Sequence, residues 1–209
     1  MQRSPYEVLA RVGALLQGHF VLTSGRHAGA YVNKDALYPH IMETSKLCRE
    51  MAGFADPGTQ VVAAPAIGGV ILSQWVSHHL GVLLGTEVLA VYAEPGPDDT
   101  LVFKRGYDQL IPGKRVLVIE DVLTTGGSAK KVVDAVRALG GDVLGVCVLS
   151  NRGGVTVEQL GNVPFLHALT NIPMESWTAE ECPLCKEGVP INTEVGKGKE
   201  FLARKASVI

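Results

Sequence analysis

The sequence predicts an α/β fold in which a central, mostly parallel sheet is flanked by helices. Short apolar runs alternate with segments of helical periodicity from residue 61 to residue 169. The run Val116–Ile119 is continuously apolar, which is typical of a strand covered on both faces. The chain has 209 residues, of which 46% are hydrophobic and 19% charged. This composition is that of a globular protein, and the length is sufficient for a full core.

The N-terminal part of the chain is expected to contain two helices joined by extended chain. Near the start, apolar residues recur at helical spacing at Val8, Leu9, Val12, Leu15 and Leu16. This spacing predicts an amphipathic helix rather than a signal peptide. Gly18–Tyr38 is irregular and rich in glycine, serine and threonine, which indicates strands and turns. A second helix is expected over Glu43–Phe54, ended by the Asp-Pro-Gly at residues 56–58.

Strands and helices then alternate in the order expected of a parallel sheet. The predicted strands are Val61–Ala64, Val88–Tyr92, Val116–Ile119, Val143–Leu149 and Phe165–Leu169. Helical patterns cover residues 70–80 and Ala129–Leu139, and Gly140 with Gly141 ends the second helix. The stretch Glu94–Asp99 has two prolines and a glycine, so a mobile loop is expected there.

Charge and cysteine content exclude several classes of protein. The formal net charge of −2 gives no electrostatic reason to expect a nucleic-acid partner. No apolar run approaches the roughly 18 residues that span a membrane, so no membrane association is expected. The four cysteines are too sparse for a disulfide framework, so a reducing, cytoplasmic location is expected.

Residues 116–128 read VLVIEDVLTTGGS and combine a strand, an acidic pair and a loop before a helix. The loop consists of Thr124, Thr125, Gly126, Gly127 and Ser128. Its glycines let the backbone approach a ligand, and free N–H groups at the helix start favour an anion. The loop is therefore predicted to hold a phosphate. The carboxylates of Glu120 and Asp121, directly after the predicted strand, suit sugar hydroxyls or a magnesium ion.

Three other interpretations of this motif fit less well. A plain βα turn with a capping hydroxyl does not require the acidic pair. A Walker P-loop is excluded because no Gly-Lys-Ser/Thr occurs in the chain. A Rossmann dinucleotide site is disfavoured because the loop lacks Gly-x-Gly-x-x-Gly and its acids precede the loop.

VLVIEDVLTTGGS resembles the signature of type I phosphoribosyltransferases, which bind phosphoribosyl pyrophosphate (PRPP). Residues 18–39, GHFVLTSGRHAGAYVNKDALYP, resemble the N-terminal segment of the orotate enzymes in that family. The resemblance covers most of the chain to about Gly154 and implies the type I phosphoribosyltransferase fold. Residues 1–209 are then expected to form one domain, with a core at 41–169 and a small cap or hood from 1–40 and 170–209.

The resemblance also implies roles for the sugar-phosphate residues. Glu120 and Asp121 would bind the ribose hydroxyls and, mainly through the substrate, a Mg²⁺ ion. Thr124–Ser128 would hold the 5-phosphate. The segment Ala64–Gly69 matches the pyrophosphate loop in position, with Ala66, Ile67 and Gly68 as its contacts.

Residues on the base side follow from the same resemblance. Arg152 matches the arginine that such enzymes use against orotate, and Tyr31 lies where an aromatic residue packs near the base. Arg26 belongs to a Ser-Gly-Arg at residues 24–26 that the family shares. Lys104 and Arg105 are candidate catalytic cations for the pyrophosphate, next to a lid expected over Glu94–Lys104.

The activity implied is transfer of the ribose 5-phosphate of PRPP to a nucleobase, with orotate in pyrimidine biosynthesis favoured and a homodimer implied. Two departures keep a purine phosphoribosyltransferase open. Thr23 stands where the orotate enzymes have lysine, and residues 100–115 differ from their usual catalytic loop. A non-catalytic regulatory protein that binds PRPP is the third possibility. The chain lacks the basic nucleic-acid-binding segment that such proteins carry.

Cys182 and Cys185 have the spacing of half a zinc site. A second pair with matching spacing is absent from the sequence, so a loop with two surface thiols is favoured. The six histidines are scattered and are interpreted as structural, with His27 as the candidate exception because it adjoins Arg26.

Overall fold

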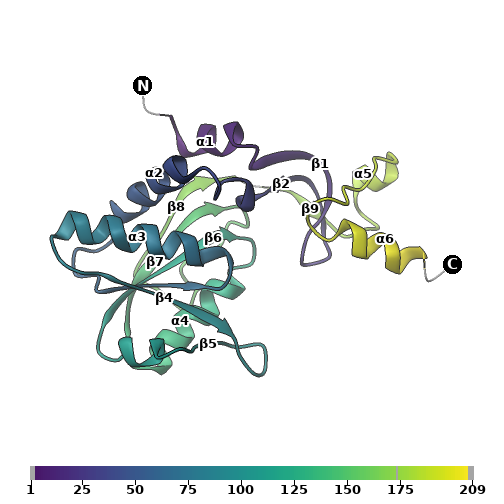
Figure 1. Ribbon diagram of the computed structural model, residues 1–209. Helices are drawn as coiled ribbons and strands as arrows, with labels where there is room; N and C mark the ends of the chain where they lie inside the picture. The colour runs from purple at the N-terminus through teal and green to yellow at the C-terminus, as the bar shows by residue number, and fades with distance from the viewer. Residues whose placement is uncertain (1–2, 173, 207–209) are drawn as a thin grey trace. The chain divides into compact units, whose positions relative to one another are not determined.

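The computed structural model describes residues 3–172 and 174–206 of the chain (Figure 1). They form two compact units. Unit 1 comprises Met1–Leu37 and Pro173–Ile209, and unit 2 comprises Tyr38–Ile172. That both units act as one domain, with unit 1 as a cap, stays a prediction. No helix among the described residues is long and apolar enough to cross a membrane.

Unit 2 contains a six-stranded sheet with the strand order β5-β4-β3-β6-β7-β8. These strands are β3 (Val61–Pro65), β4 (Leu89–Pro95), β5 (Leu101–Phe103), β6 (Arg115–Leu123), β7 (Asp142–Asn151) and β8 (Leu166–Asn171). All neighbours pair in parallel except β5, which pairs antiparallel with β4 at one edge. The predicted mostly parallel sheet is confirmed, together with its five parallel strands.

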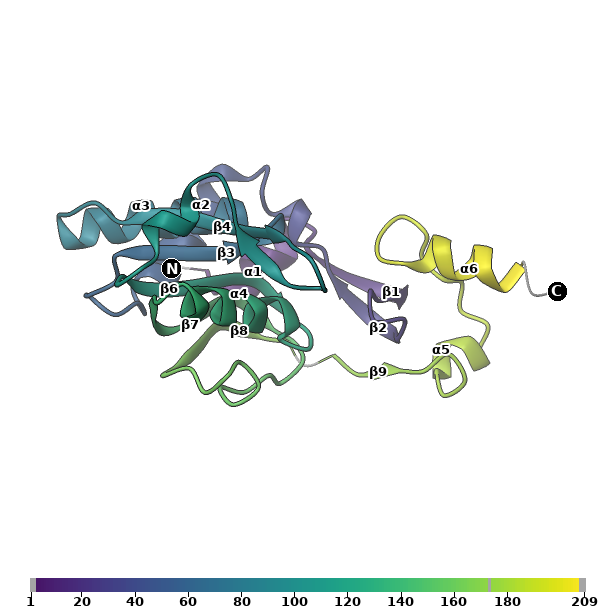
Figure 2. The ribbon, with the colours of Figure 1, turned by 90° about the horizontal axis from the view of Figure 1, so that it is seen from below.

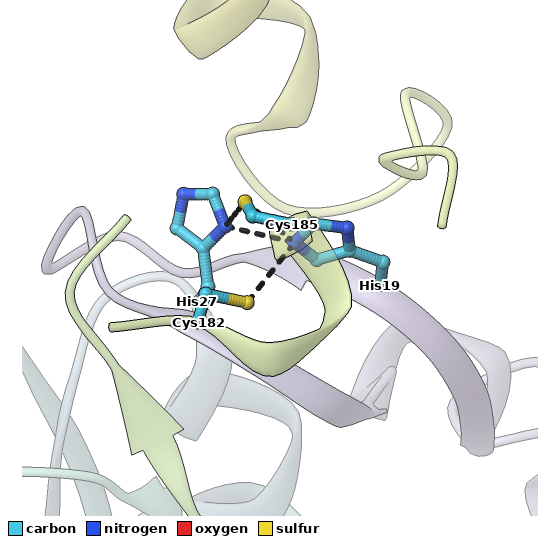
Figure 3. A group of neighbouring side chains, drawn as sticks. All are labelled: His19, His27, Cys182 and Cys185. Carbon is cyan, nitrogen blue, oxygen red and sulfur yellow. Dashed lines mark hydrogen bonds between the residues drawn. The ribbon is translucent and has the colours of Figure 1, made fainter. Parts of the chain in front are cut away.

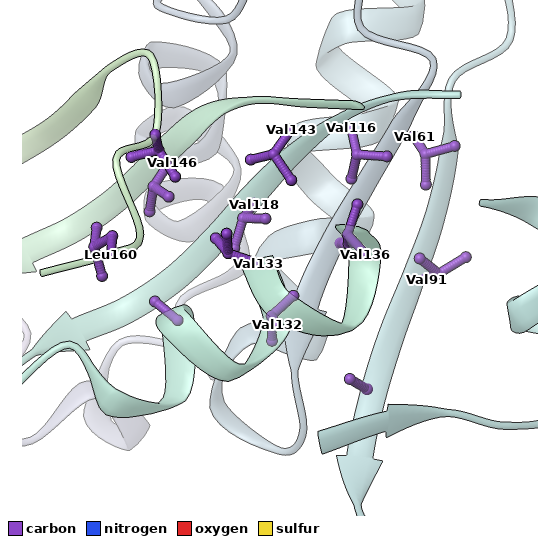
Figure 4. Close-up of a cluster of buried hydrophobic side chains, with 14 of the residues drawn as sticks. Val61, Val91, Val116, Val118, Val132, Val133, Val136, Val143, Val146 and Leu160 are labelled. Carbon is purple, nitrogen blue, oxygen red and sulfur yellow. The ribbon is translucent and has the colours of Figure 1, made fainter. Parts of the chain in front are cut away.

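Helices cover both faces of this sheet (Figures 1 and 2). Helices α2 (Ile41–Ala52) and α3 (Gly68–Leu84) lie on one face, and α4 (Gly127–Ala138) lies on the other. A short 3-10 helix, η2 (Tyr107–Leu110), precedes β6. Buried valines fill the space between α4 and the sheet: Val116, Val118, Val132, Val133, Val136 and Val146 (Figure 4). Burial on both faces is the physical reason why Val116–Ile119 is continuously apolar.

Strand β6 is longer than the apolar run that predicted it. It continues to Leu123, so Glu120 and Asp121 lie inside the strand and not after it. Pairing with β7 extends through this region, where Glu120 faces Val148 and Val122 faces Ser150. The backbone ladder with β7 therefore keeps the strand regular although its side chains become acidic.

The predicted loop before β5 is also shorter than expected. Glu94 and Pro95 belong to β4, where they pair with Val102 and Leu101 of β5. Only the tip of this hairpin is irregular, and the Gly96 N–H closes it by donating to the Thr100 carbonyl at 3.0 Å. The expectation of a loop beginning at Glu94 is therefore wrong for the first two residues.

Unit 1 begins with α1 (Pro5–Arg11), which is shorter than the predicted helix. Ser4 and Glu7 form a capping box at its start. Gly13, in the left-handed region at φ 73°, follows the helix, and the chain turns there into a strand. Leu15 and Leu16 are therefore part of β1 (Leu15–Val21), and the expectation that they continue the helix is wrong.

The rest of unit 1 combines a small antiparallel sheet with short helices. Strand β2 (His27–Val32) pairs with β1 on one side and with β9 (Ser176–Trp177) on the other. The 3-10 helix η1 (Lys34–Ala36) follows β2, and the C-terminal segment carries α5 (Pro183–Lys186) and α6 (Gly198–Ala206). The segment between these two helices returns to β1, where the Asn192 N–H donates to the His19 carbonyl at 2.7 Å.

Candidate active site

Two helices of unit 2 begin at the same edge of the sheet, after neighbouring strands. Helix α3 follows β3, and helix α4 follows β6. Strands β3 and β6 are neighbouring parallel strands, so the two connecting loops open at the same edge. Ligands of open parallel sheets bind at this edge, and each helix start adds N–H groups and a positive dipole end. The edge can therefore hold an anion at two adjacent points.

The loop Thr124–Ser128 has the geometry expected of a phosphate site. Gly126 is the N-cap of α4 and adopts φ 78°, in the left-handed region. A Cβ at Gly126 would lie 2.9 Å from Val155 Cγ1, so no larger residue fits there. The first intrahelical bond is donated by Lys130 N–H to the Gly126 carbonyl at 2.9 Å. The N–H groups of the first turn have no acceptor within the helix, and that of Gly127 donates to Thr125 Oγ1 at 3.4 Å, so this turn can offer donors to an anion.

The loop after β7 supports the phosphate loop from behind. The N–H groups of Arg152 and Gly153 both donate to the Leu123 carbonyl, at 3.0 and 3.1 Å. A Cβ at Gly153 would lie 1.7 Å from the Thr124 carbonyl oxygen, so the two backbones touch. This contact brings Arg152, which is 9% exposed, to the end of β6.

Asn151 shapes the same turn through its side chain. Its Nδ2 donates to the Val155 carbonyl at 2.9 Å, and its Oδ1 accepts from the Val155 N–H at 3.0 Å. Sequence reasoning did not assign roles to Asn151 or Gly153. The sequence signal for both is the Asn-Arg-Gly-Gly at residues 151–154 directly after a predicted strand.

The acidic pair lies at the same end of β6. Glu120 and Asp121 are each 6% exposed. The Asp121 N–H donates to Glu120 Oε1 at 2.9 Å, and the Val122 N–H donates to Asp121 Oδ1 at 2.5 Å. Val116 and Val118 pack on the side of α4, so strand alternation places Glu120 on that face and Asp121 on the other. Carboxylate oxygens at a ligand-binding edge are the donor type that Mg²⁺ takes beside substrate phosphates, so the residues fit this ion.

The loop between β3 and α3 is held against its neighbours in the sheet. The Ala66 N–H donates to the Ala93 carbonyl of β4 at 2.8 Å, and the Ala66–Ile67 peptide bond is cis. The Tyr38 hydroxyl donates to the Gly68 carbonyl at 2.6 Å. A Cβ at Gly69 would lie 2.6 Å from the Ala64 Cβ, so glycine permits the close contact of α3 with β3. Ala66, Ile67 and Gly68 thus stand at the start of α3, as expected from their position.

The two candidate cations lie just after β5 and have partners within their own hairpin. Lys104 Nζ donates to the Pro95 carbonyl at 3.0 Å. Arg105 forms an ion pair with Glu94 at 3.0 Å, and this hydrogen bond raises the pKa of Arg105 above its ordinary value. Each contact uses one donor of its side chain, so Lys104 and Arg105 have further donors to offer a pyrophosphate.

Arg26 and Tyr31 belong to unit 1. Arg26 is in the turn between β1 and β2, and its guanidinium donates to the Ser176 hydroxyl at 3.0 Å and to the Ser176 carbonyl. Tyr31 packs against Phe20, with ring centroids 5.5 Å apart. Their role as contacts of a base stays a prediction.

Comparison with known proteins shows the family of this chain. The phosphoribosyl transferase domain matches residues 27–166. An orotate phosphoribosyltransferase of Pelotomaculum thermopropionicum is 41% identical, with coverage of 88% of this chain and 91% of that one. Another, of Chlorobaculum parvum, is 41% identical over 86% and 88% of the two chains. The crystal structure of orotate phosphoribosyltransferase from Aeropyrum pernix superposes with a TM-score of 0.62 at 26% identity, covering 79% and 92%.

The matched domain contains the phosphate loop, the acidic pair, the loop before α3 and Arg152. The residues that predicted binding of the sugar phosphate therefore lie in the matched part of the chain, and Arg26 lies just before it. The chain belongs to the phosphoribosyltransferase family, as a homologue of the orotate phosphoribosyltransferases.

Proposed function

We propose that this enzyme transfers the ribose 5-phosphate of PRPP to orotate, forming orotidine 5-phosphate and pyrophosphate in pyrimidine biosynthesis. The single observation that carries the proposal is the pair of helix starts on neighbouring strands β3 and β6, with the acidic pair on β6. PRPP has phosphate groups on both sides of a ribose. A site with two anion-binding helix starts and carboxylates for hydroxyls matches that distribution of charge.

In the proposed complex, each part of PRPP is bound by its own group of residues. The 5-phosphate binds the N–H and hydroxyl groups of Thr124–Ser128 at the start of α4. The pyrophosphate binds at Ala66–Gly68, at the start of α3. Glu120 and Asp121 accept hydrogen bonds from the ribose hydroxyls. Arg152 contacts the base.

The proposed reaction is a displacement at C1 of the ribose. A ring nitrogen of the base forms a bond to C1, the C1–O bond to pyrophosphate breaks, and its electron pair leaves with pyrophosphate. The proton of that nitrogen is released to solvent. Positive charge develops on the ribose and negative charge on the leaving group. Donors at the start of α3, with Lys104 and Arg105, stabilise the leaving charge, and the fixed helix starts supply the orientation. The hairpin tip next to Lys104 acts as a lid that excludes water.

Mg²⁺ is proposed to bind mainly through the substrate, with Glu120 and Asp121 as the protein groups that face it. When bound, the ion would neutralise part of the charge of the pyrophosphate. We propose further that the enzyme works as a homodimer in the cytoplasm, which sedimentation analysis of the purified chain and fractionation of its host cells would test.

The test of the function is a comparison of bases. The purified chain is incubated with PRPP and Mg²⁺ and with orotate, uracil, adenine, hypoxanthine, guanine or xanthine, and pyrophosphate release is followed. Release with orotate alone is expected. Release with a purine base instead would replace the proposal by a purine phosphoribosyltransferase. Binding of PRPP without turnover of any base would favour a regulatory protein.

A further inference from the structure

Four metal-ligating side chains meet within unit 1, from segments far apart in the sequence (Figure 3). His19 lies in β1, His27 begins β2, and Cys182 and Cys185 lie at the start of α5 and within it. Each offers one ligand atom, and these atoms all lie within 4.8 Å of one another. Two histidines and a Cys-x-x-Cys pair form the ligand set of a Cys₂His₂ zinc site.

Three of the six separations between ligand atoms match those of a tetrahedral site. Nitrogen and sulfur ligands of zinc, at about 2.0–2.1 and 2.3 Å from the ion, lie about 3.5 Å from each other. The measured separations are 3.5 Å from Cys182 Sγ to His19 Nε2, 3.7 Å from Cys185 Sγ to the same nitrogen, and 3.4 Å from Cys185 Sγ to His27 Nδ1. His19 Nε2 and His27 Nδ1 are 2.8 Å apart, so a shift of about 0.5 Å between the rings brings them to the spacing of two zinc-bound nitrogens.

The hydrogen bond of His19 Nδ1 leaves Nε2 as the ring nitrogen that faces the cluster. His19 Nδ1 lies 2.8 Å from the Val189 carbonyl oxygen. Since a carbonyl only accepts, the proton of the neutral ring is on Nδ1, and the lone pair of Nε2 points at the cluster. A ligating histidine is usually held in this way, by a hydrogen bond from its other nitrogen. The His27 ring is held by Phe201 of α6, edge to face at 4.8 Å.

Burial gives a further reason for an ion. His19, His27 and Cys182 are at most 2% exposed, and among the described residues no carboxylate joins the cluster. Cys185 is exposed, but packing two imidazoles and the Cys182 thiol together out of water is unfavourable without compensation. A divalent ion with two thiolates and two neutral imidazoles has no net charge and uses all four ligand atoms. The expectation of two surface thiols is therefore wrong for Cys182.

A redox function of the Cys-x-x-Cys pair fits less well. A redox pair presents an exposed attacking thiol at the start of a helix. Here the thiol before the helix, Cys182, is fully buried, and the exposed Cys185 lies within α5. Both sulfur atoms contact histidine nitrogens.

We propose that His19, His27, Cys182 and Cys185 bind one structural zinc ion. Four protein ligands leave no open coordination position, so the ion has no catalytic role. It joins the β1–β2 hairpin to α5, across about 160 residues of sequence, and so stabilises unit 1, which is small for a unit without a metal or disulfide. It also fixes the hairpin that carries Arg26, next to His27.

Metal analysis of the full chain tests this directly. The chain is produced with zinc in the medium, without a polyhistidine tag, purified without chelators and analysed by plasma mass spectrometry. About one zinc per chain is expected for the wild type. Cys182→Ser and Cys185→Ser should each lower this by more than about tenfold, because a four-ligand site is broken. Cys147→Ser is the matched control and should keep its zinc, since Cys147 lies in β7 of unit 2.

Two measurements on the wild type remain decisive if the variants fail to fold. X-ray absorption at the zinc edge should show two sulfur atoms at about 2.3 Å and two nitrogen atoms at about 2.0–2.1 Å. Thiol alkylation should label neither Cys182 nor Cys185 until the zinc is removed by a chelator. Cys48 and Cys147 serve as internal references, because burial raises the pKa of each to about 12 and keeps both unreactive.

Three results would overturn the proposal. The first is a folded chain, produced with zinc, that contains none. The second is a zinc ion whose shell lacks sulfur. The third is a disulfide between Cys182 and Cys185 that, once reduced, still leaves the chain unable to take up zinc.

Discussion

At Asp121, replacing one carboxylate oxygen by an amide nitrogen tests a role in catalysis separately from a role in folding. Its carboxylate lies at the carboxyl half of β6, 6% exposed, and one oxygen already accepts from the Val122 N–H. An asparagine has the same shape, and its amide oxygen can accept from the same N–H. The exchange therefore removes the charge offered to the ribose or to Mg²⁺ and leaves the local backbone contact in place.

For Asp121→Asn we expect kcat/KM to fall about 10- to 150-fold, which corresponds to the roughly 1.5–3 kcal/mol of a hydrogen bond to a charged group. The free energy of unfolding should change by less than about 1 kcal/mol. Pyrophosphate release and urea denaturation measure the two quantities. Asp134→Asn is the control, because Asp134 pairs with Lys130 on the surface of α4 and should leave kcat/KM unchanged. Loss of folding in Asp121→Asn with normal activity of the folded fraction would make Asp121 a structural residue.

At the scale of the element, α4 has a glycine in the left-handed region at each end. Gly126 and Gly140 both have φ 78°. They differ in their surroundings, since a Cβ at Gly126 would meet Val155 and Leu160 within about 3 Å, whereas nothing lies within 4 Å of a Cβ at Gly140. The two positions form a matched pair in which backbone strain is equal and only one side chain disturbs the phosphate loop.

Gly140→Ala is expected to lower the free energy of unfolding by about 1–2 kcal/mol, the cost of a left-handed alanine, and to leave the Kd for PRPP unchanged. Gly126→Ala should cost more, because it adds a clash beneath the loop, and should weaken PRPP binding at least about tenfold. Chemical denaturation and isothermal titration calorimetry give both values. Equal PRPP affinity in the two variants would mean that Gly126 does not shape a phosphate site.

At the scale of the whole molecule, ligand binding should stabilise the two units differently. The residues proposed to bind the sugar phosphate lie in unit 2, and the proposed zinc ligands lie in unit 1. A ligand raises the free energy of unfolding of the unit that it binds, by about 2.7 kcal/mol when its concentration is a hundred times its Kd. In a chain of this size, that energy corresponds to a shift in Tm of about 5–10 °C.

Calorimetry should therefore show that PRPP with Mg²⁺ raises the unfolding temperature of the transition that includes unit 2. Ribose 5-phosphate is the control ligand and should give a smaller shift, because it lacks the pyrophosphate held at the start of α3. A chelator should lower the stability of unit 1 with PRPP absent. An equal shift with both sugar phosphates would argue against the pyrophosphate site at Ala66–Gly68.

Much of unit 2 could be predicted because its signals are local. Val116–Ile119 is apolar on both sides of its strand, and the valines of α4 recur at helical spacing, so each element is recorded in its own residues. The residues at which the elements begin and end depend on contacts with distant parts of the chain. β6 runs past its apolar run because β7 pairs with it as far as Leu123, and Leu16 is in a strand because β2 pairs with it. The role of Gly153 was not predicted for the same reason, since its close contact is with Thr124, in the loop that follows another strand.

The sequence by itself predicted the parallel sheet and a phosphate loop with an acidic pair, because these depend on residues adjacent in the chain, and the family resemblance supplied the sugar phosphate. Only the tertiary structure decided that α3 and α4 follow neighbouring strands and that Gly153 contacts Thr124. The same holds for His19 and His27, which complete the ligand set of Cys182 and Cys185. Contacts between residues so far apart in the sequence form through strand pairing and burial, and neither leaves a periodic pattern at the positions that meet.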